Sequence, residues 1–248
     1  MIQVPLPEVE FPGGLCHLVA TPIGNLGDIG LRALAVLAAA DIVFAEDTRH
    51  TRGLLDRYGI KVPLASYHDH NKARVVPLIV SRLKEGAKVA VVSDAGMPCI
   101  SDPGFTLTRA LLEEDLPWTV IPGPSSTVTA LVLSGYSPDR FLYLGYAPRK
   151  KGQRRTFLEM ALEEPGTVLI FESCHRIRST LEILGELAPK RQVAVAREIS
   201  KIHEETLRGN AEELLEILTG PRLKGELVMV LQGQGGRRPK AAGETGGQ

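Results

Sequence analysis

Aromatic side chains are scarce in this chain of 248 residues, where they make up 5% of the sequence. Proteins that bind single-stranded nucleic acid often stack bases on aromatic rings, so the composition argues against a base-stacking platform. An excess of basic charge is also lacking, because 29 lysines and arginines balance 29 aspartates and glutamates. A dedicated nucleic-acid binder is usually basic overall. Any contact with nucleic acid must therefore come from local patches or from a preformed ribonucleoprotein partner.

Cysteines and long apolar runs are few as well. The three cysteines, Cys16, Cys99 and Cys174, lie far apart and form no CxxC pair, which favours reduced thiols in or near the core of a cytoplasmic protein. No apolar segment is long enough to span a bilayer, and the N-terminus has no basic-then-apolar leader pattern. We therefore expect a cytoplasmic protein with no membrane partner. Walker A and GxGxxG motifs are also missing, which disfavours nucleotide hydrolysis and conventional dinucleotide binding.

What the chain does contain is an alternation of apolar strand-like runs and helical patterns. In the first half, strands are expected at residues 15–21, 41–46, 62–66, 88–93 and 118–122. Helices are expected between them at residues 29–40, 49–57, 72–85 and 103–114, with Asp28, Asn71 and Asp102-Pro103 at their starts. This order predicts a parallel sheet covered by helices on both faces.

The second half predicts another, less regular α/β unit with a mixed sheet. A helix is expected at 125–134, strands at 141–146, 167–172, 192–197, 204–209 and 225–233, and helices at 153–163, 176–187 and 210–218. We therefore expect a flexible N-terminus (1–13), two α/β domains (14–123 and 124–233) and a glycine-rich disordered tail (234–248). A cleft between two such domains is a common ligand site.

The loops that follow the first five strands are rich in small and polar residues. They read TPIGNLGD (21–28), EDTRHTR (46–52), YHDHN (67–71), SDAGMPCISDPG (93–104) and PGPSS (122–126). Ligands of open α/β sheets bind beyond the carboxyl ends of the strands, so these loops are the expected site. Gly96 permits close backbone approach, Asp94 can accept hydrogen bonds from a ligand, and Ser125 and Ser126 begin a helix.

Each feature also has an ordinary structural explanation. The glycine-rich loops resemble simple turns, and Asp102 and Ser125 are typical helix caps. His17 lies within an expected strand and is interpreted as a packed core residue. The run His68, Asp69 and His70 lacks a third ligand nearby in sequence, so no metal site is expected.

Seven segments together are far more specific than any one of them. They are LVATPIGNLGDI (18–29), AEDTRHT (45–51), SYHDHN (66–71), VSDAGMPCISDPG (92–104), PGPSS (122–126), FESCHRI (171–177) and AREISKIHE (196–204). In this order the chain resembles a family of small-subunit ribosomal RNA methyltransferases within the tetrapyrrole-methylase superfamily. The resemblance covers residues 15–233. Met97 and Cys99 depart mildly from the family pattern, in which threonine and an aliphatic residue are expected.

The resemblance implies two α/β domains that bind S-adenosyl-L-methionine (AdoMet) in the cleft between them, and a homodimer. It also implies 2′-O-methylation of a cytidine ribose in the decoding centre of 16S rRNA, on the assembled small subunit. The residues implied to contact AdoMet are Pro22, Ser93, Asp94, Ala95, Gly96, Met97, Ser125, Ser126, Phe171, Ala196 and Arg197.

A ribose hydroxyl is a poor nucleophile, so a base that accepts its proton is expected to help. Glu46 and Asp47 are favoured by position, and His68 and His70 are the alternatives. Arg49 and Arg52 either bind RNA phosphate together with His50 or pair with the neighbouring acids. The densest basic run supplies further phosphate contacts or an ordinary charged surface, and it contains Arg149, Lys150, Lys151, Arg154 and Arg155.

Two other functions fit the same features. The chain is alternatively a methyltransferase of the same superfamily acting on a tetrapyrrole or another small substrate, because a fold does not determine its substrate. It is alternatively a non-catalytic module that binds ribosomes. The small, acid-bearing loops favour an enzyme over such a module.

Overall fold

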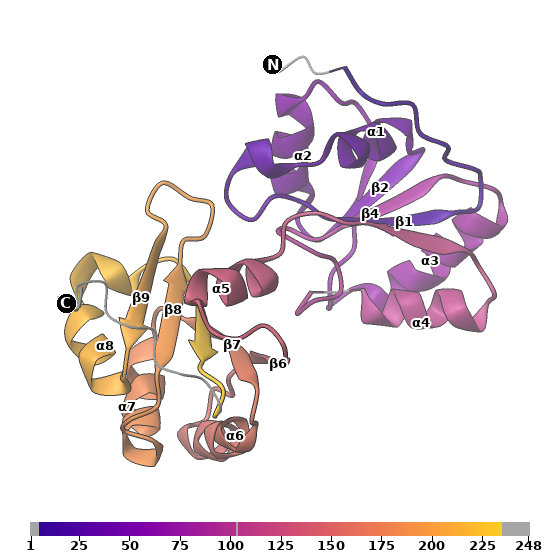
Figure 1. Cartoon of the computed structure of the whole chain (residues 1–248). Coiled ribbons are helices and arrows are strands. Elements are labelled where there is room, and N and C mark those ends of the chain that lie inside the picture. Colours follow the sequence, from indigo (N-terminus) through magenta and orange to yellow (C-terminus); the bar gives the residue numbers. More distant parts are fainter. Residues whose placement is uncertain (1–4, 103, 235–248) are drawn as a thin grey trace. The chain divides into compact units, whose positions relative to one another are not determined.

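The structure is a computed structural model that describes residues 5–102 and 104–234 (Figure 1). The chain divides into two compact units, Met1–Ser125 and Ser126–Gln248. The division lies close to the expected boundary at residues 123–124.

The first unit is built on a five-stranded parallel sheet. Its strands are β1 (Cys16–Val19), β2 (Ile42–Ala45), β3 (Leu64–Ser66), β4 (Val89–Val92) and β5 (Trp118–Ile121). Their order across the sheet is β3-β2-β4-β1-β5, and every neighbouring pair is parallel. The predicted parallel sheet is therefore confirmed.

Helices cover both faces of this sheet (Figure 1). They are α1 (Leu31–Ala39), α2 (Thr48–Arg57), α3 (Lys72–Lys84) and α4 (Phe105–Glu113), with a short 3₁₀ helix, η1 (Leu26–Asp28), before α1. Ala90 and Val92 of β4 pack in the core beneath α1 and α2, whereas Val89 and Val91 pack with α3 and α4. A strand buried on both faces needs apolar side chains at every position, which explains the unbroken run VAVV.

Two expected helix starts are wrong. The first helix begins after Gly30, and Asp28 belongs to η1 instead. The helix expected from residue 103 begins at Phe105 with Gly104 as its N-cap, so Asp102 does not cap it. A backbone φ of +153° at Gly104 suits glycine and brings that position close to Cys99. Pro103, the expected first helical residue, lies outside the described residues.

The N-terminal segment also differs from expectation at Phe11. This side chain was expected in a flexible stretch, but it is buried in the core. Its ring meets the imidazole of His17 edge-on, with 4.0 Å between ring centroids. His17 is itself buried, so its prediction as a packed core histidine is confirmed.

The second unit has a mixed sheet, as predicted. Its strands are β6 (Phe141–Tyr146), β7 (Thr167–Ser173), β8 (Val193–Arg197), β9 (Glu205–Gly209) and β10 (Glu226–Leu231), in the order β6-β7-β10-β8-β9. Only β6 and β7 pair in parallel among these described strands. Because they are parallel, the loops that follow them reach the same edge of the sheet.

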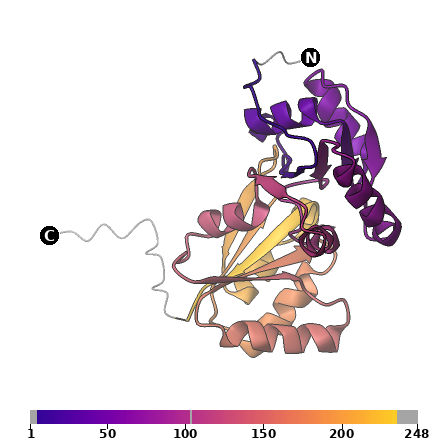
Figure 2. The same cartoon turned by 90° about the vertical axis from the view of Figure 1, so that its right-hand side faces the viewer.

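Four helices pack on this second sheet (Figure 2). They are α5 (Ser126–Ser134), α6 (Lys151–Glu163), α7 (Ile177–Leu187) and α8 (Ala211–Ile217), and a 3₁₀ turn, η2 (Gly220–Leu223), precedes β10. The main core joins α6, α7 and α8 to one face of the sheet, and α5 packs on the other face. Figure 2 shows α5 and α6 on opposite sides of the strands.

The structure describes only the first residue of the expected C-terminal tail. Gln234 was assigned to the disordered tail, but its main-chain amide donates to the Pro165 carbonyl and its side chain donates to Leu162. The remainder of that tail, residues 235–248, lies outside the described residues. All three cysteines are free. Within residues 5–102 and 104–234, no helix has both the length and the apolar character needed to cross a membrane.

Candidate active site

The loops after β1 and β4 meet at the carboxyl edge of the first sheet. Thr21 and Gly96 exchange two main-chain hydrogen bonds of 3.0 Å, and the Thr21 hydroxyl donates to the Ser93 carbonyl at 3.2 Å. The chain leaves β1 toward β2 on one side and leaves β4 toward β5 on the other. This meeting point is therefore the topological switch point of the sheet, where open α/β folds bind their ligands.

Gly96 is needed for this junction. Its φ of +80° is a left-handed conformation that disfavours other residues. A Cβ atom there would lie 3.3 Å from the Ile23 side chain and 3.6 Å from the Pro124 carbonyl. The loops after β1, β4 and β5 therefore converge on Gly96. Its own amide is already bonded to Thr21 and the residue is buried, so Gly96 contributes the shape of the junction rather than a free donor.

The loop after β2 joins the same edge through Asp94. Oδ1 of Asp94 accepts a hydrogen bond of 2.8 Å from the main-chain amide of Asp47. This contact holds the start of α2 against the end of β4. It also brings Glu46, the residue just before Asp47, next to Asp94.

Four acidic residues influence one another at this edge. Burial, the negative charge of Asp94 and that of Asp69 raise the pKa of Glu46 above its usual range, and the Asp94 amide and His68 offset part of this rise. Burial and the charge of Glu46, followed by those of Asp94 and Asp69, raise the pKa of Asp102 to about 6. The Ser93 hydroxyl lies near the Asp102 carboxylate and lowers its pKa in part. The two side chains do not form a hydrogen bond of ordinary geometry. The site therefore concentrates negative charge that a cation would stabilise.

Glu46 and Asp47 have opposite electrostatic environments. Asp47 caps α2 by accepting from the Arg49 amide at 2.8 Å, and its carboxylate also binds the Arg49 guanidinium at 3.0 and 3.2 Å. These hydrogen bonds from the side chain and backbone of Arg49 lower the pKa of Asp47 to about 2. A carboxylate so stabilised is a weak base. Of the two predicted proton acceptors, Glu46 is the better suited.

The arginines near these acids behave differently from each other. Arg49 forms the ion pair with Asp47 that the sequence left open, although its side chain is 88% exposed. Arg52 does not pair with an acid in the described part of the chain and donates to the Val62 carbonyl at 3.3 Å. His50 is exposed on α2.

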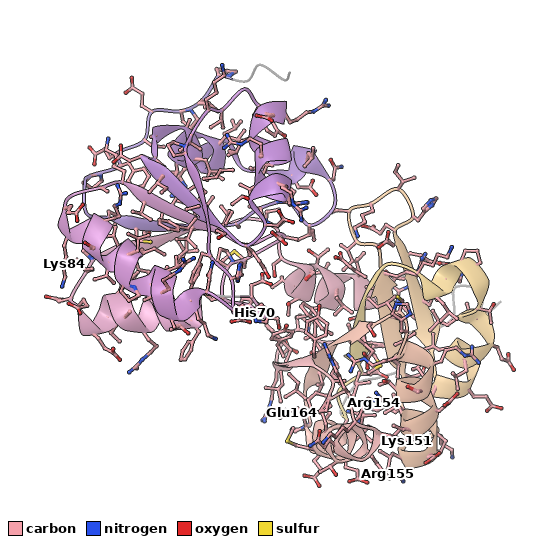
Figure 3. All side chains as sticks on the ribbon, turned by 180° about the vertical axis from the view of Figure 1, so that it is seen from behind. His70, Lys84, Lys151, Arg154, Arg155 and Glu164 are labelled. Atoms are coloured by element: carbon pink, nitrogen blue, oxygen red, sulfur yellow. The ribbon has the colours of Figure 1, made fainter. Side chains whose placement is uncertain are left out.

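Of the two histidines in the next loop, His68 lies within electrostatic reach of Glu46. His68 and His70 lie with ring centroids 6.0 Å apart, and His70 is exposed (Figure 3). Within the described residues, no group of three or more His, Cys, Asp or Glu side chains is arranged to hold a metal ion.

The other predicted AdoMet contacts from Pro22 to Ser126 differ in burial. Pro22 is buried directly after Thr21, Ser93 is buried at the end of β4, Ala95 is exposed and Met97 is half-buried. Ser125 and Ser126 are both half-buried and mark the start of α5. The structure thus brings Pro22 and Ser93 to Met97 together at one edge.

The three predicted contacts of the second unit lie within its sheet. Phe171 of β7 contacts the rings of Tyr143 and Tyr146, with centroid separations of 5.0 and 5.3 Å. Ala196 is buried in β8. Arg197 is also buried, and its guanidinium binds the carbonyls of His203, Pro221 and Lys224 and the carboxylate of Glu205. These contacts give Arg197 a role in holding its own unit together.

The residues of the basic run have three different environments, and Figure 3 labels Lys151, Arg154 and Arg155. Arg149, Lys150 and Lys151 are exposed at the start of α6. Arg155 pairs with Glu186 at 2.6 Å and with Glu159 at 3.4 Å. Arg154 is only 4% exposed, so its prediction as a surface contact for RNA is wrong. The reason is helical geometry, which places Arg154 on the buried face of α6 together with Leu158 and Ala161.

Asp102 is the residue whose place at the site the sequence missed. It was interpreted as a helix cap because it precedes a proline. The structure instead places it within the electrostatic reach of Glu46 and Asp94. The signal available in the sequence was its occurrence in a loop that follows a buried strand.

The sequence and the fold correspond to a known family. The family model of the tetrapyrrole (corrin/porphyrin) methylases matches residues 16–215. Solved structures agree on the fold: a uroporphyrin-III C-methyltransferase from Thermus thermophilus has a TM-score of 0.62 at 23% identity, covering 88% of this chain and 94% of that one. A cobalt-precorrin-4 methyltransferase of cobalamin biosynthesis has a TM-score of 0.65 at 16% identity, covering 88% and 95%. The chain belongs to the tetrapyrrole methylase family.

Curated relatives are similar over most of the chain, and each is named ribosomal RNA small subunit methyltransferase I. The relative from Halalkalibacterium halodurans is 42% identical over 90% of this chain and 77% of its own length. That from Haemophilus influenzae is 44% identical over 89% and 79%. That from Thermotoga maritima is 42% identical over 89% and 99%.

The chain is a methyltransferase whose methyl donor is S-adenosyl-L-methionine. AdoMet supplies a methyl group on a positively charged sulfonium. The residues present fit this group, because Asp94, Glu46 and Asp102 form a negatively charged edge without a cationic partner of their own in the described contacts. Gly96 lets the loops after β1 and β4 pack tightly at the same edge, because a Cβ atom there would crowd Ile23.

Proposed function

We propose that this methyltransferase modifies the 2′-hydroxyl of a cytidine ribose in the decoding centre of 16S rRNA, on the assembled small ribosomal subunit. The observation that carries the proposal is the identity of 42–44% with relatives named for small-subunit rRNA. The chain covers between 77% and 99% of their lengths. The balanced net charge also suits an enzyme that recognises a folded particle rather than free RNA.

The proposed AdoMet-binding residues come from several loops and strands. Pro22 and the segment from Ser93 to Met97 form the AdoMet-binding surface, with Asp94 as its charged group. Ser125 and Ser126, together with Phe171, Ala196 and Arg197, complete the proposed set. Holding the hydroxyl oxygen in line with the bond that breaks supplies up to about 7–11 kcal/mol in ideal cases.

Glu46 is the proposed proton acceptor. The Glu46 carboxylate would accept the hydroxyl proton as the ribose oxygen takes the methyl group. The electron pair of the broken methyl–sulfur bond would stay on the sulfur, which leaves as a neutral thioether. The raised pKa of Glu46 makes it a stronger base than Asp47. A well-placed general base contributes about 10²–10⁴ in rate.

The exposed cations at the start of α6 are the proposed RNA contacts. Arg149, Lys150 and Lys151 are exposed, and no ion pair within the described residues involves them. Arg49, His50 and Arg155 are further proposed contacts on the surface, and Arg52 is a weaker one because it is held on Val62. Phosphate contacts of this kind make binding sensitive to salt.

The proposal includes a homodimer that acts in the cytoplasm, where small subunits are assembled. The edge strand β5 exposes Trp118 and Val120, and an edge strand with apolar side chains is suited to pairing with a second copy. Sedimentation equilibrium at several concentrations tests this part, with a mass of twice 26.9 kDa as the expected result.

The deciding experiment is methyl transfer from tritium-labelled AdoMet to small subunits from cells that lack this gene. Protein-free rRNA is the comparison, and AdoMet binding is titrated separately. Label in the subunit rRNA at an alkali-resistant linkage is the expected result. Absence of label with AdoMet still bound would contradict the substrate and direct the search to tetrapyrroles. Binding to subunits without AdoMet binding would indicate a non-catalytic module.

A further inference from the structure

Three successive carbonyl groups at the end of β6 accept hydrogen bonds from two arginines. Arg176, at the start of α7, donates to the Ala147 carbonyl at 2.9 Å. Arg154, in the first turns of α6, donates through one nitrogen to the Pro148 and Arg149 carbonyls at 3.5 and 3.4 Å. The backbone of residues 147–149, which leads to the exposed cations, is therefore held by two arginine side chains of the second unit.

Both arginines are anchored in the second unit. The other terminal nitrogen of Arg154 donates to the Ser179 hydroxyl at 2.9 Å, and that hydroxyl donates to the Arg176 carbonyl at 2.9 Å. Arg176 itself pairs with the buried carboxylate of Glu172 at 2.8 Å. The connection thus runs from the loop through α6 to α7.

Arg154 is unusual because it is a buried cation without an acidic partner. It is only 4% exposed, and no acidic side chain in the described residues forms an ion pair with it. Burying a charge is costly unless other groups compensate it. Here two loop carbonyls and the Ser179 hydroxyl accept from the terminal nitrogens, whereas Nε is buried without a hydrogen-bond partner among the described residues. The burial of Arg154 therefore holds the loop.

Lys150 and Lys151 lie at the N-terminus of α6, where the helix dipole disfavours positive charge. Lys150 is the N-cap of α6, makes no side-chain capping bond, and is followed by Lys151, and the first turn has no acidic residue. Positive side chains at a helix N-terminus are repelled by the helix dipole. Such an arrangement destabilises the free protein and is relieved when an anion binds.

We propose that Arg154 is a positioning residue, which fixes the 147–150 backbone so that Arg149, Lys150 and Lys151 face RNA phosphate as a preformed group. This inference rests on the proposed function, since it concerns how the same RNA is bound. Arg154 itself does not touch the RNA. Because folding already orders this loop, RNA binding does not lose the conformational entropy of ordering it.

The test compares Arg154→Lys and Arg154→Met with the wild type in the full chain. Lysine keeps the positive charge, but it lacks the planar fork whose two separate nitrogens reach the loop carbonyls on one side and the Ser179 hydroxyl on the other. Both variants are expected to raise KM for small subunits by about tenfold, which corresponds to one weakened interaction of ordinary strength. The kcat at saturating subunits and the Kd for AdoMet are expected to stay within about twofold of wild type.

Arg178→Lys is the matched control. Arg178 also clamps backbone carbonyls in the second unit, those of Leu215 and Leu218 at 2.7 and 2.9 Å, but at the end of α8. It is expected to lower the melting temperature without changing KM. Amide hydrogen exchange adds a direct readout, because residues 147–152 are expected to exchange at least about tenfold faster in Arg154→Lys and at the wild-type rate in Arg178→Lys.

Three other outcomes would overturn the positioning role of Arg154 or the proposed function. An unchanged KM in Arg154→Lys with a raised KM in Arg154→Met would show that the charge acts directly, which overturns positioning. Unchanged KM and exchange in both variants, while Arg149→Ala raises KM, would overturn the role of Arg154 and leave RNA binding intact. A wild-type enzyme that fails to methylate subunits would overturn the proposed function and this inference with it.

Discussion

The main-chain amide of Asp47 donates a hydrogen bond of 2.8 Å to Oδ1 of Asp94, across 47 residues of sequence. This contact ties the end of β2 to the end of β4. It places Glu46 beside a second carboxylate, and burial together with the charge of that carboxylate raises the pKa of Glu46. One hydrogen bond therefore shapes both the proposed AdoMet surface and the proposed base.

Substitution of Asp94 separates these two contributions. Asp94→Ala leaves the Asp47 amide without its acceptor and is expected to cost about 1–3 kcal/mol of unfolding free energy. Asp94→Asn retains an acceptor oxygen and is expected to keep most of that stability, while loss of the negative charge weakens AdoMet binding in both variants. Urea unfolding and calorimetric titration with AdoMet measure the two effects. Full AdoMet affinity in Asp94→Asn would contradict the proposed charge contact.

Gly96→Ala is expected to disrupt the junction with Thr21. A left-handed φ of +80° costs a residue with a Cβ about 1–2 kcal/mol, and the new atom would crowd Ile23. Both stability and AdoMet affinity are expected to fall. Gly53→Ala in α2 is the control, because a Cβ there meets nothing within 4 Å and is expected to stabilise the helix by about 0.5–1 kcal/mol. Equal effects of the two substitutions on unfolding would refute this explanation.

The two acids after β2 are expected to differ in catalysis. Glu46→Gln removes the proposed base and is expected to lower kcat by about 10²–10⁴, with little change in the Kd for AdoMet. Asp47→Asn is expected to affect kcat much less and to destabilise the start of α2 by about 1 kcal/mol. Single-turnover rates across pH provide the measurement. The wild-type rate is expected to fall on acidification at a pH above the ordinary glutamate value of 4.5, because the base must be ionised.

The raised pKa of Asp102 predicts a pH-dependent contribution to stability. The group titrates near 3.8 when unfolded and at about 6 in the folded chain, so the folded state binds the proton more tightly. Its contribution is fully present below about pH 4 and is lost as the pH rises through about 6. Wild type is therefore expected to lose stability relative to Asp102→Asn over that interval. Urea unfolding of both proteins at several pH values checks this, and parallel curves would contradict it.

Reversing the charges of Arg149, Lys150 and Lys151 is expected to weaken binding of the small subunit but not binding of AdoMet. The triple variant Arg149→Glu, Lys150→Glu and Lys151→Glu removes up to three phosphate contacts. The slope of log affinity against log salt is expected to become shallower by about two to three. AdoMet affinity is expected to stay unchanged, and its parallel loss would contradict the separation of the two binding surfaces. Arg109→Glu on α4 is a control at another exposed arginine, which pairs with Glu113.

Much of the fold follows from local sequence patterns. The run Val89–Val92 predicts a strand buried on both faces, and the structure confirms it. The parallel first sheet and the mixed second sheet were predictable because apolar periodicity and turn residues act over a few neighbouring positions. Helix starts were less predictable, as Asp28 and Asp102 show, because several residues near a helix end compete to cap it.

The roles of individual site residues required the tertiary structure. Glu46 and Asp47 are adjacent carboxylates in the sequence. Burial and the charge of Asp94 raise the pKa of Glu46, whereas hydrogen bonds from Arg49 lower that of Asp47. Likewise, Arg154 belongs to a uniform basic run, and only packing against α7 buries it. The sequence by itself determined the elements, the loops that carry the site and the family. The structure decided which side chains are buried, paired or exposed, because burial and charge pairing depend on residues far apart along the chain.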